Sequence, residues 1–498
     1  MKRPLIRKLR LMSSSRSSFS GSFSSRSSSV SSISGQRERG VTMVLVALAM
    51  VAIIAMAALS IDVITLYLAR EEAQRAADAA ALAAARVISI SGVTGDPAGF
   101  VTWESACSSA TQAATAVATQ SAVGGTVANP VVTYSSSSNG TSSGNCATVG
   151  GAFPVNPMVT VKITRTSLPT FFSRIWGITG NSISATATAE VLNPSASDAF
   201  TSSGSVTPVQ PSCVKPWMVP NIDPGNPAGC PTGSCLPFVT LADGSIQNPG
   251  IRPVTASGVI GETFNLFADC APGSSCALVQ PPGTLPLAPQ ANINTGTFVA
   301  GPPATPNLEY LPGMTSFASV AVPSCSATTG LVAEYEPAIA GCDQGTSYQC
   351  GVQSSLAVSP ANAVDLTENP GGGTGDTATG ASCLINQSTG QDTINTLSYP
   401  YLITAGTGNP NTALNGKVIS VSNSIMSFPI YDSSSTTDFS VNPTNVTIVG
   451  FLQVFVNSVG TDGSLNVTVL NVAGCGNNAA NRAVTGSSPV PIRLITPP

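Results

Sequence analysis

An uncharged run of 21 residues, from Val41 to Ile61, is the feature that most limits how this chain can fold. A helix rises about 1.5 Å per residue, so a helical run of this length matches the roughly 30 Å hydrocarbon core of a bilayer. The next residues, Asp62 to Val87, contain no glycine or proline and are rich in alanine, the strongest helix former. We therefore predict a single N-terminal transmembrane helix, residues 41–61, that continues outward as an Ala-rich helix.

The distribution of charge around this run predicts its orientation. Nine of the 20 lysines and arginines lie in residues 1–40, against the single acid Glu38. By the positive-inside rule this basic tail, which we expect to be disordered, stays in the cytoplasm. The prediction is a single-pass protein of the inner (cytoplasmic) membrane, with the bulk of the chain periplasmic or extracellular. An alternative stays open, because a secretory signal cleaved near Ala55-Met56-Ala57 would release the body.

Alanines recur at every fourth residue after the uncharged run and share one face of the expected helix. Small side chains let another helix approach closely, so we predict a helix-packing face. Its members are Ala69, Ala73, Ala77, Ala81 and Ala85. On a more polar face, Glu71 and Arg75 have the i,i+4 spacing of a favourable ion pair.

Residues in a fixed order surround the apolar run within residues 39–88. Arg39 precedes the run, and polar and small residues follow it. The residues that carry the pattern are Gly40, Asp62, Tyr67, Arg70, Gln74, Asp78, Ala79 and Leu82. This order resembles the N-terminal domain of TadG-like (TadE/TadG-type) proteins of the Flp (Tad) pilus-assembly system. More weakly, Leu168–Val191 is similar to the segment that closes the small extracytoplasmic domain of such proteins.

The resemblance implies a membrane-anchored structural or accessory component of tight-adherence pilus assembly, or of a related envelope apparatus. It implies a non-catalytic protein without a cofactor, whose partners are the membrane bilayer and other pilus-assembly or envelope proteins. One position departs from the pilin pattern. Prepilin peptidases of this pathway cut after a glycine and favour glutamate at the fifth residue beyond it, where this chain has Leu45. We therefore expect a retained anchor rather than a processed pilin subunit.

Composition divides the rest of the chain into three parts. Residues 89–192 predict a small α+β, pilin-like unit, and residues 193–210, rich in Ser, Pro and Thr, predict a linker. The unit's expected elements are a second helix over 98–122 and strands over 126–134, 157–164 and 182–191. Residues 211–498 predict a large β-rich, disulfide-containing extracytoplasmic module. Its most apolar strand, 448–456, should form a hairpin with the strand that follows Gly460–Gly463.

All cysteines follow the apolar run, on the side expected to be outside. They are Cys107, Cys146, Cys213, Cys230, Cys235, Cys270, Cys276, Cys325, Cys342, Cys350, Cys383 and Cys475. Their even number predicts disulfides in an oxidising compartment. Candidate bridges join cysteines close in sequence, 230 with 235, 270 with 276 and 342 with 350, and the sequence leaves the connectivity open. Because no Cys-x-x-Cys pair and no histidine occurs, we expect no metal site.

The absence of histidine disfavours enzymes that use imidazole for acid–base or nucleophilic catalysis. The opposing hypotheses are a secreted adhesin and an extracytoplasmic hydrolase that uses two carboxylates, with Glu334, Glu336 and Asp343 as candidate acids. The mildly acidic body predicts no nucleic-acid partner, and we expect no small-molecule substrate. Gly375–Ser382 has the glycine spacing of a phosphate-binding loop but lacks its lysine, which predicts a flexible loop.

Overall fold

The computed structural model divides the chain into two units, Met1–Ile61 and Asp62–Pro498. The residues that it describes are 37–95, 100–136, 139–149, 153, 157–170, 172, 177, 180–191, 210–211, 213–226, 236–242, 244–252, 254–268, 307–313, 335–341, 348, 362–364, 374–433, 444–461, 463–475, 485–486, 490 and 492–495. Residues 1–36 of the predicted tail and most of the predicted linker, 193–209, lie outside them. The last four residues of the predicted disordered tail, 37–40, instead form the first turn of helix α1 (Arg37–Ile90).

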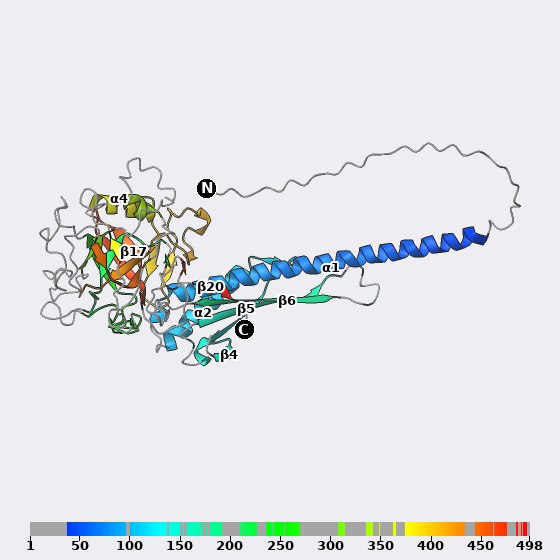
Figure 1. The fold of residues 1–498 in the computed structure, drawn as a ribbon, viewed down its shortest axis with the longest axis horizontal. Helices are drawn as coiled ribbons and strands as arrows, with labels where there is room; N and C mark the ends of the chain where they lie inside the picture. Colours follow the sequence, from blue (N-terminus) through cyan, green and yellow to red (C-terminus); the bar gives the residue numbers. More distant parts are fainter. Residues whose placement is uncertain are drawn as a thin grey trace, which may run out of the picture. The chain divides into compact units, whose positions relative to one another are not determined.

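Helix α1, Arg37–Ile90, is 54 residues long and contributes to both units (Figure 1). From Val41 to Ile61 its side chains are exposed, apart from those of Ala55 and Ala58. From Ala73 onward most of its alanines belong to the core of the second unit. The long apolar N-terminal helix expected from the sequence is confirmed.

A left-handed glycine follows the end of α1. Gly92 has φ +73°, a conformation that glycine adopts without a Cβ penalty. A Cβ at this position would lie 2.2 Å from the carbonyl oxygen of Leu470. The chain therefore turns here, and a short 3-10 helix, η1 (Val93–Gly95), leads towards α2, Phe100–Ala118.

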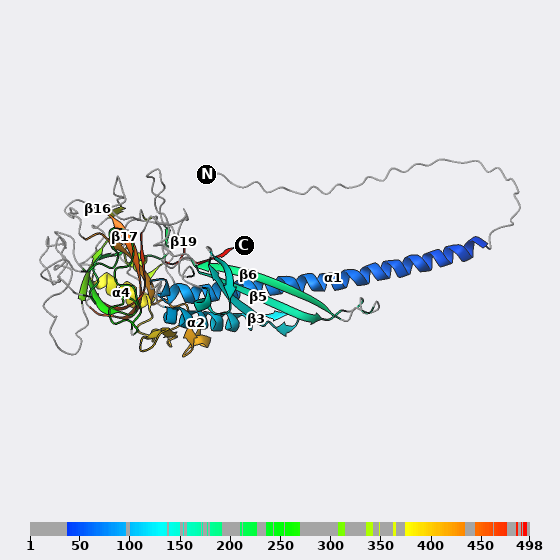
Figure 2. The same ribbon diagram turned by 90° about the horizontal axis from the view of Figure 1, so that it is seen from below.

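A five-stranded antiparallel sheet lies alongside α1 and α2 in the order β20-β6-β5-β3-β4 (Figures 1 and 2). Its strands are β3 (Pro130–Ser136), β4 (Asn139–Ser143), β5 (Pro157–Leu168), β6 (Asn181–Val191) and β20 (Ile492–Ile495). Alternate residues such as Val159 and Val161 of β5 are buried in one core with the alanines of α1 and α2. β20 brings the C-terminal region back to β6, where Arg493 forms an ion pair with Glu190 at 2.8 Å.

A disulfide ties α2 to the sheet side of this unit. Cys107 of α2 is bonded to Cys146 at the start of the 3-10 helix η2, Cys146–Thr148. The sequence predicts disulfides but leaves their connectivity open. The hydroxyl of Tyr134 on β3 donates to the carbonyl oxygen of Cys107 at 2.6 Å. Cys213, Cys383 and Cys475 are also disulfide-bonded, and none of the described cysteines is free. The three predicted short-range bridges lie outside the described residues.

The remainder of the second unit is β-rich, as expected, and contains a closed barrel in the order β10-β8-β15-β17-β18-β9. Its strands are β8 (Trp217–Pro220), β9 (Thr263–Ala268), β10 (Asn307–Pro312), β15 (Ile425–Tyr431), β17 (Ile448–Val459) and β18 (Leu465–Gly474). The predicted hairpin is confirmed as the β17–β18 pair. Trp217 fills the barrel core, with its ring 5.3 Å from Phe428 and 5.7 Å from Tyr310.

Shorter elements complete the described part of the chain. They are β1 (Ala122–Val123), β2 (Thr126–Val127), β7 (Gln210–Pro211), α3 (Tyr335–Ala340), β11 (Asn362–Val364), α4 (Thr374–Leu384), β12 (Thr393–Asn395), β13 (Leu402–Thr404), η9 (Thr412–Leu414), β14 (Val418–Ile419), β16 (Thr444–Val446) and β19 (Thr485–Gly486). The prediction of a flexible loop at Gly375–Ser382 is wrong, because this segment forms most of α4. Gly380 lets α4 pack closely on α3, since a Cβ there would lie 3.0 Å from a side-chain carbon of Ile339.

Candidate functional site

The apolar part of α1 has the dimensions of a membrane anchor. Among the described residues, α1 is the helix that is long and apolar enough to cross a membrane. Arg37 and Arg39 lie in its first turn, and the family-pattern residue Gly40 is helical beside them. Twenty-one uncharged residues follow, from Val41 to Ile61, and at about 1.5 Å per residue they are long enough to span the roughly 30 Å hydrocarbon core of a bilayer.

The alanine face of α1 is buried within the second unit. Relative exposure is 3 % for Ala69 and 0 % for the other members of the predicted packing face, Ala73, Ala77, Ala81 and Ala85. Helix α2 contributes a second alanine stripe to the same core, formed by Ala106, Ala110, Ala114 and Ala118. Small side chains on both helices allow their backbones to approach neighbouring elements closely. The alanine face of α1 is therefore covered by residues of this chain's own core.

Asp62 is a buried carboxylate directly after the uncharged run. Its side chain is only 4 % exposed, and Oδ2 accepts a hydrogen bond from the backbone N–H of Phe172 at 3.1 Å. Burying a carboxylate without a partner is costly, so this bond offsets part of the desolvation penalty. Asp62 thereby links α1 to the connection between β5 and β6.

Further polar residues fasten α1 to the rest of the unit. Gln74 Nε2 donates to Asp78 Oδ1 at 2.7 Å and to the carbonyl oxygen of Thr186, on β6, at 3.3 Å. Glu72 Oε2 accepts from the backbone N–H of Gly124 at 2.8 Å. The pattern's polar residues Asp62 and Gln74 thus bind backbone groups of the sheet region.

The ion pair predicted between Glu71 and Arg75 on the exposed face of α1 is confirmed. Arg75 Nη2 lies 3.3 Å from Glu71 Oε2. Both side chains are largely exposed, so the pair adds little to stability.

The apolar run and the polar residues beyond it match a known family. Residues 40–87 match the family model described as "Putative Flp pilus-assembly TadE/G-like". The chain carries a TadE/G-like segment. This confirms the resemblance expected from the sequence. No curated protein and no solved structure gives a significant match to the chain.

Two residues of the TadE/G-like segment point away from the core. Tyr67 is 68 % exposed and Arg70 is exposed too. Both line a groove between α1 and the start of β6, with a cavity volume of about 250 Å³, here named the Arg70 groove. Its lining residues are Val63, Leu66, Tyr67, Arg70, Asn181, Ser182 and Ile183. Of the other family-pattern residues, Ala79 is exposed and Leu82 is half-buried against the core.

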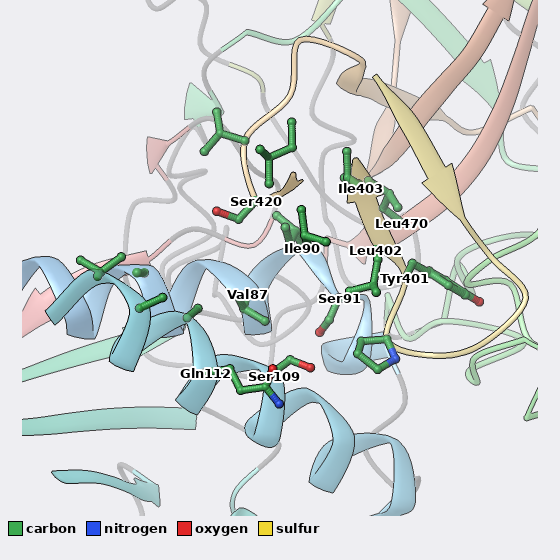
Figure 3. A pocket seen from close by; sticks show the side chains of 18 of the residues that line it. Val87, Ile90, Ser91, Ser109, Gln112, Tyr401, Leu402, Ile403, Ser420 and Leu470 are labelled. Carbon is green, nitrogen blue, oxygen red and sulfur yellow. The ribbon is translucent and has the colours of Figure 1, made fainter. Parts of the chain in front are cut away.

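A larger, mainly apolar groove of about 510 Å³ lies between α1, α2 and the β12–β14 sheet (Figure 3). Val87 and Ile90 of α1 face Leu402 and Ile403 of β13 across it, and Gln112 of α2 lines the same space (Figure 3). No carboxylate, amine or thiol lines it, so its described walls offer burial for apolar atoms rather than acid–base groups.

The phenol of Tyr401 at the edge of this larger groove is engaged elsewhere. Its hydroxyl donates to the carbonyl oxygens of Arg252 and Ile260. Burial raises the pKa of Tyr401 above its usual range, while the charge of Arg252 acts in the opposite direction. Tyr401 therefore serves as a neutral hydrogen-bond donor that fixes the loop around Arg252.

A buried carboxyl pair, not anticipated from the sequence, lies beside the barrel. Asp223 is 0 % exposed and accepts hydrogen bonds from the backbone N–H groups of Gly225 and Asn226 and from the amide of Asn248. Glu262 is 2 % exposed and has Arg252 Nη2 3.9 Å from its Oε2. Burial raises the pKa of Glu262 well above its usual range, and the negative charge of Asp223 adds to the effect.

The acids proposed for a hydrolase form no such pair in the described residues. Glu334 and Asp343 lie outside them, and Glu336 is buried in the short helix α3. Sequence spacing could not reveal the pair formed by Asp223 and Glu262, because 39 residues separate them.

Lys215 is a buried amine whose position is set by α3. Its Nζ donates to the carbonyl oxygens of Ile339 and Gly341 at 2.7 and 2.6 Å, at the C-terminal end of that helix. Burial lowers the pKa of Lys215 to about 7. Its side chain closes the last turn of α3, where helix carbonyls lack partners within the helix.

Proposed function

We propose that this protein is a membrane-anchored, non-catalytic structural or accessory component of Flp (tight adherence) pilus assembly or of a related envelope apparatus. The match of residues 40–87 to the TadE/G-like family carries the proposal. The same residues lie on a helix with an apolar stretch of membrane length and a second stretch packed into a folded unit. Anchoring a folded body to the bilayer through one continuous helix is the task that this arrangement suits.

The proposed topology follows from charge and cysteine chemistry. Residues 41–61 remain as a single-pass anchor in the inner membrane, with the basic tail in the cytoplasm. The body lies on the periplasmic or extracellular side. The Cys107–Cys146 disulfide supports this placement, because disulfides persist in oxidising envelope compartments and are rare in the cytosol. Leu45, at the position where the peptidase favours glutamate, supports an anchor that is not processed.

The finer architecture belongs to the same proposal. The pilin-like unit over residues 89–192 packs on the Ala-rich continuation of α1, and β20 adds a strand to its sheet from the C-terminal region. After a linker at 193–210, the rest of residues 211–498 forms the extracytoplasmic module. The mainly apolar lining of the groove in Figure 3 supports a body that contacts other envelope proteins rather than one that catalyses.

Topology is tested by placing one tag before Gly40 and another at the C-terminus. The membranes are then fractionated and protease is added from outside. We expect one full-length membrane species that loses only the C-terminal tag. A C-terminal part recovered free of the N-terminal tag would show that residues 41–61 are removed and would contradict a retained anchor.

The role in assembly is tested by deleting the gene in the source organism and counting surface pili by electron microscopy. We expect the deletion to reduce pili and the full chain to restore them. As a matched control, the body from Asp62 onward is exported behind a cleavable signal, which should fail to restore pili because it lacks the anchor. Normal piliation in the deletion strain would contradict the proposal.

A further inference from the structure

The Arg70 groove begins just beyond the apolar stretch that ends at Ile61. Val63 and Arg70 follow Ile61 by two and nine residues, so along the helix axis they lie about 3 Å and about 14 Å further on. Helical side chains lean back towards the N-terminus, which brings the Arg70 guanidinium several ångströms nearer the bilayer than its Cα. The headgroup region is roughly 5 to 8 Å deep on each side of the hydrocarbon core. The guanidinium therefore lies near the outer edge of the headgroup region, within reach of a lipid phosphate.

The wall of the Arg70 groove changes from apolar to cationic with distance from the membrane end. Val63 and Leu66 lie at the near end, Arg70 at the far end, and Tyr67 between them. Val63 is 41 % and Tyr67 68 % exposed, and tyrosine favours this interfacial depth. Together these side chains can contact both an acyl chain and the headgroup above it.

The charge of Arg70 is available to a ligand. Within the part of the chain that the structure describes, Arg70 has no hydrogen-bond or ion-pair partner. The neighbouring acids on α1 are engaged, because Asp62 accepts from Phe172 N and Glu71 pairs with Arg75. An incoming anion therefore need not displace an internal partner.

A second guanidinium lies on the same side of the sheet. Arg165 of β5 is paired in register with Ile183 of β6, which lines the groove, so the two side chains share a face. The Nε atom of Arg165 is buried without a hydrogen-bond partner among the described residues. Guanidinium forks match the oxygens of a phosphate.

We propose that the Arg70 groove binds the phosphate of an anionic phospholipid in the outward-facing leaflet. Arg70 holds the phosphate, and Val63 and Leu66 contact the start of an acyl chain. The inference rests on the proposed membrane anchoring and adds a specific lipid ligand to it. Such a lipid would fix the height of the body above the bilayer.

The test is native mass spectrometry of the full chain in detergent, with phosphatidylglycerol, phosphatidylcholine or inorganic phosphate added separately. We expect the parent protein to retain one phosphatidylglycerol in preference to phosphatidylcholine. Arg70→Gln should lower that retention about fivefold, as expected for loss of one cationic contact to an anionic lipid. Arg70→Lys should keep part of it, since lysine binds phosphate as a point charge. Lys417→Gln, at an exposed position outside the groove, is the control and should leave retention unchanged.

Three results would overturn the lipid site: equal retention of both lipids, retention unaffected by Arg70→Gln, or an equal loss in the control. Displacement of the lipid by millimolar inorganic phosphate would assign the groove to the free anion and overturn it too. Flotation with phosphatidylcholine vesicles reports the anchor independently. If flotation persists without a lipid preference, only the lipid site fails, whereas loss of flotation removes the proposed anchoring itself.

Discussion

Asp62 Oδ2 accepts a hydrogen bond at 3.1 Å from the backbone N–H of Phe172, a residue 110 positions further along the chain. The bond joins the first residue after the uncharged run to the connection between β5 and β6. Because the carboxylate is 4 % exposed, the interaction is shielded from water and screened little by salt. One residue of the TadE/G-like segment thus fixes the end of the β5–β6 hairpin to α1.

Replacing Asp62 should release this connection. Asp62→Ala leaves the Phe172 N–H without its acceptor, and we expect a loss of about 1 to 3 kcal/mol in the free energy of unfolding. Hydrogen exchange at the Phe172 amide and denaturant unfolding in detergent measure the effect. Asp62→Asn keeps an acceptor oxygen at the same position and should lose less. If the hydrogen-exchange rate of the Phe172 amide were unchanged in Asp62→Ala, the bond would contribute nothing to the stability of this connection.

Removing the Cys107–Cys146 bridge should destabilise the unit of α1, α2 and the sheet. The bridge closes a loop with a sequence separation of 39, for which the chain-entropy relation gives about 4 kcal/mol. Denaturant unfolding of the Cys107→Ala/Cys146→Ala double variant measures the loss. Each single variant serves as a control for unpaired thiols, which the double variant lacks. A double variant as stable as the parent would exclude this contribution.

Local patterns in the sequence predicted the elements that depend on neighbours along the chain. Helix α1 follows from an uncharged run and an alanine-rich continuation without glycine or proline, both of which act within a few residues. The β17–β18 hairpin follows from an apolar strand, a Gly460–Gly463 turn and a second strand. These signals need no tertiary contact to be recognised.

Long-range pairings escaped the same reasoning. The barrel closes through parallel pairs such as Ile430 with Val219, which 211 residues separate, and β20 joins β6 from the other end of the chain. The composition of a strand does not indicate which distant strand it pairs with. The candidate site shows the same limit, since the pattern singled out Asp62 and Arg70 but neither Phe172 nor Arg165.

An alanine at Gly92 should disrupt the exit from α1. The φ of +73° disfavours any side chain, and a Cβ would lie 2.2 Å from the Leu470 carbonyl oxygen and 2.5 Å from a side-chain carbon of Ile260. We expect Gly92→Ala to cost about 2 to 4 kcal/mol, from backbone strain plus overpacking.

Gly125→Ala is the matched control for Gly92→Ala. Gly125 also has a positive φ, +81°, but no atom lies within 4 Å of its Cβ position. The control isolates the backbone penalty and should cost about 1 kcal/mol. Equal losses in the two variants, measured by denaturant unfolding, would show that the contact with Leu470 is relieved by movement.

Lys215 should make stability rise with pH in the alkaline range. Its pKa is lowered by burial to about 7 from an ordinary value of 10.5, so between these values the unfolded chain binds more protons than the folded one. The free energy of unfolding therefore increases with pH across this window, by at most about 1.4 kcal/mol per unit, and this term is flat below pH 7. Lys215→Met should flatten the dependence of the unfolding free energy on pH, whereas Lys417→Met, at an exposed position, should leave the parent slope unchanged.

A Lys215→Met variant that keeps the parent slope between pH 7 and 10.5 would show that the buried ammonium keeps its proton. In that case the carbonyl groups of Ile339 and Gly341 at the end of α3 stabilise its charge.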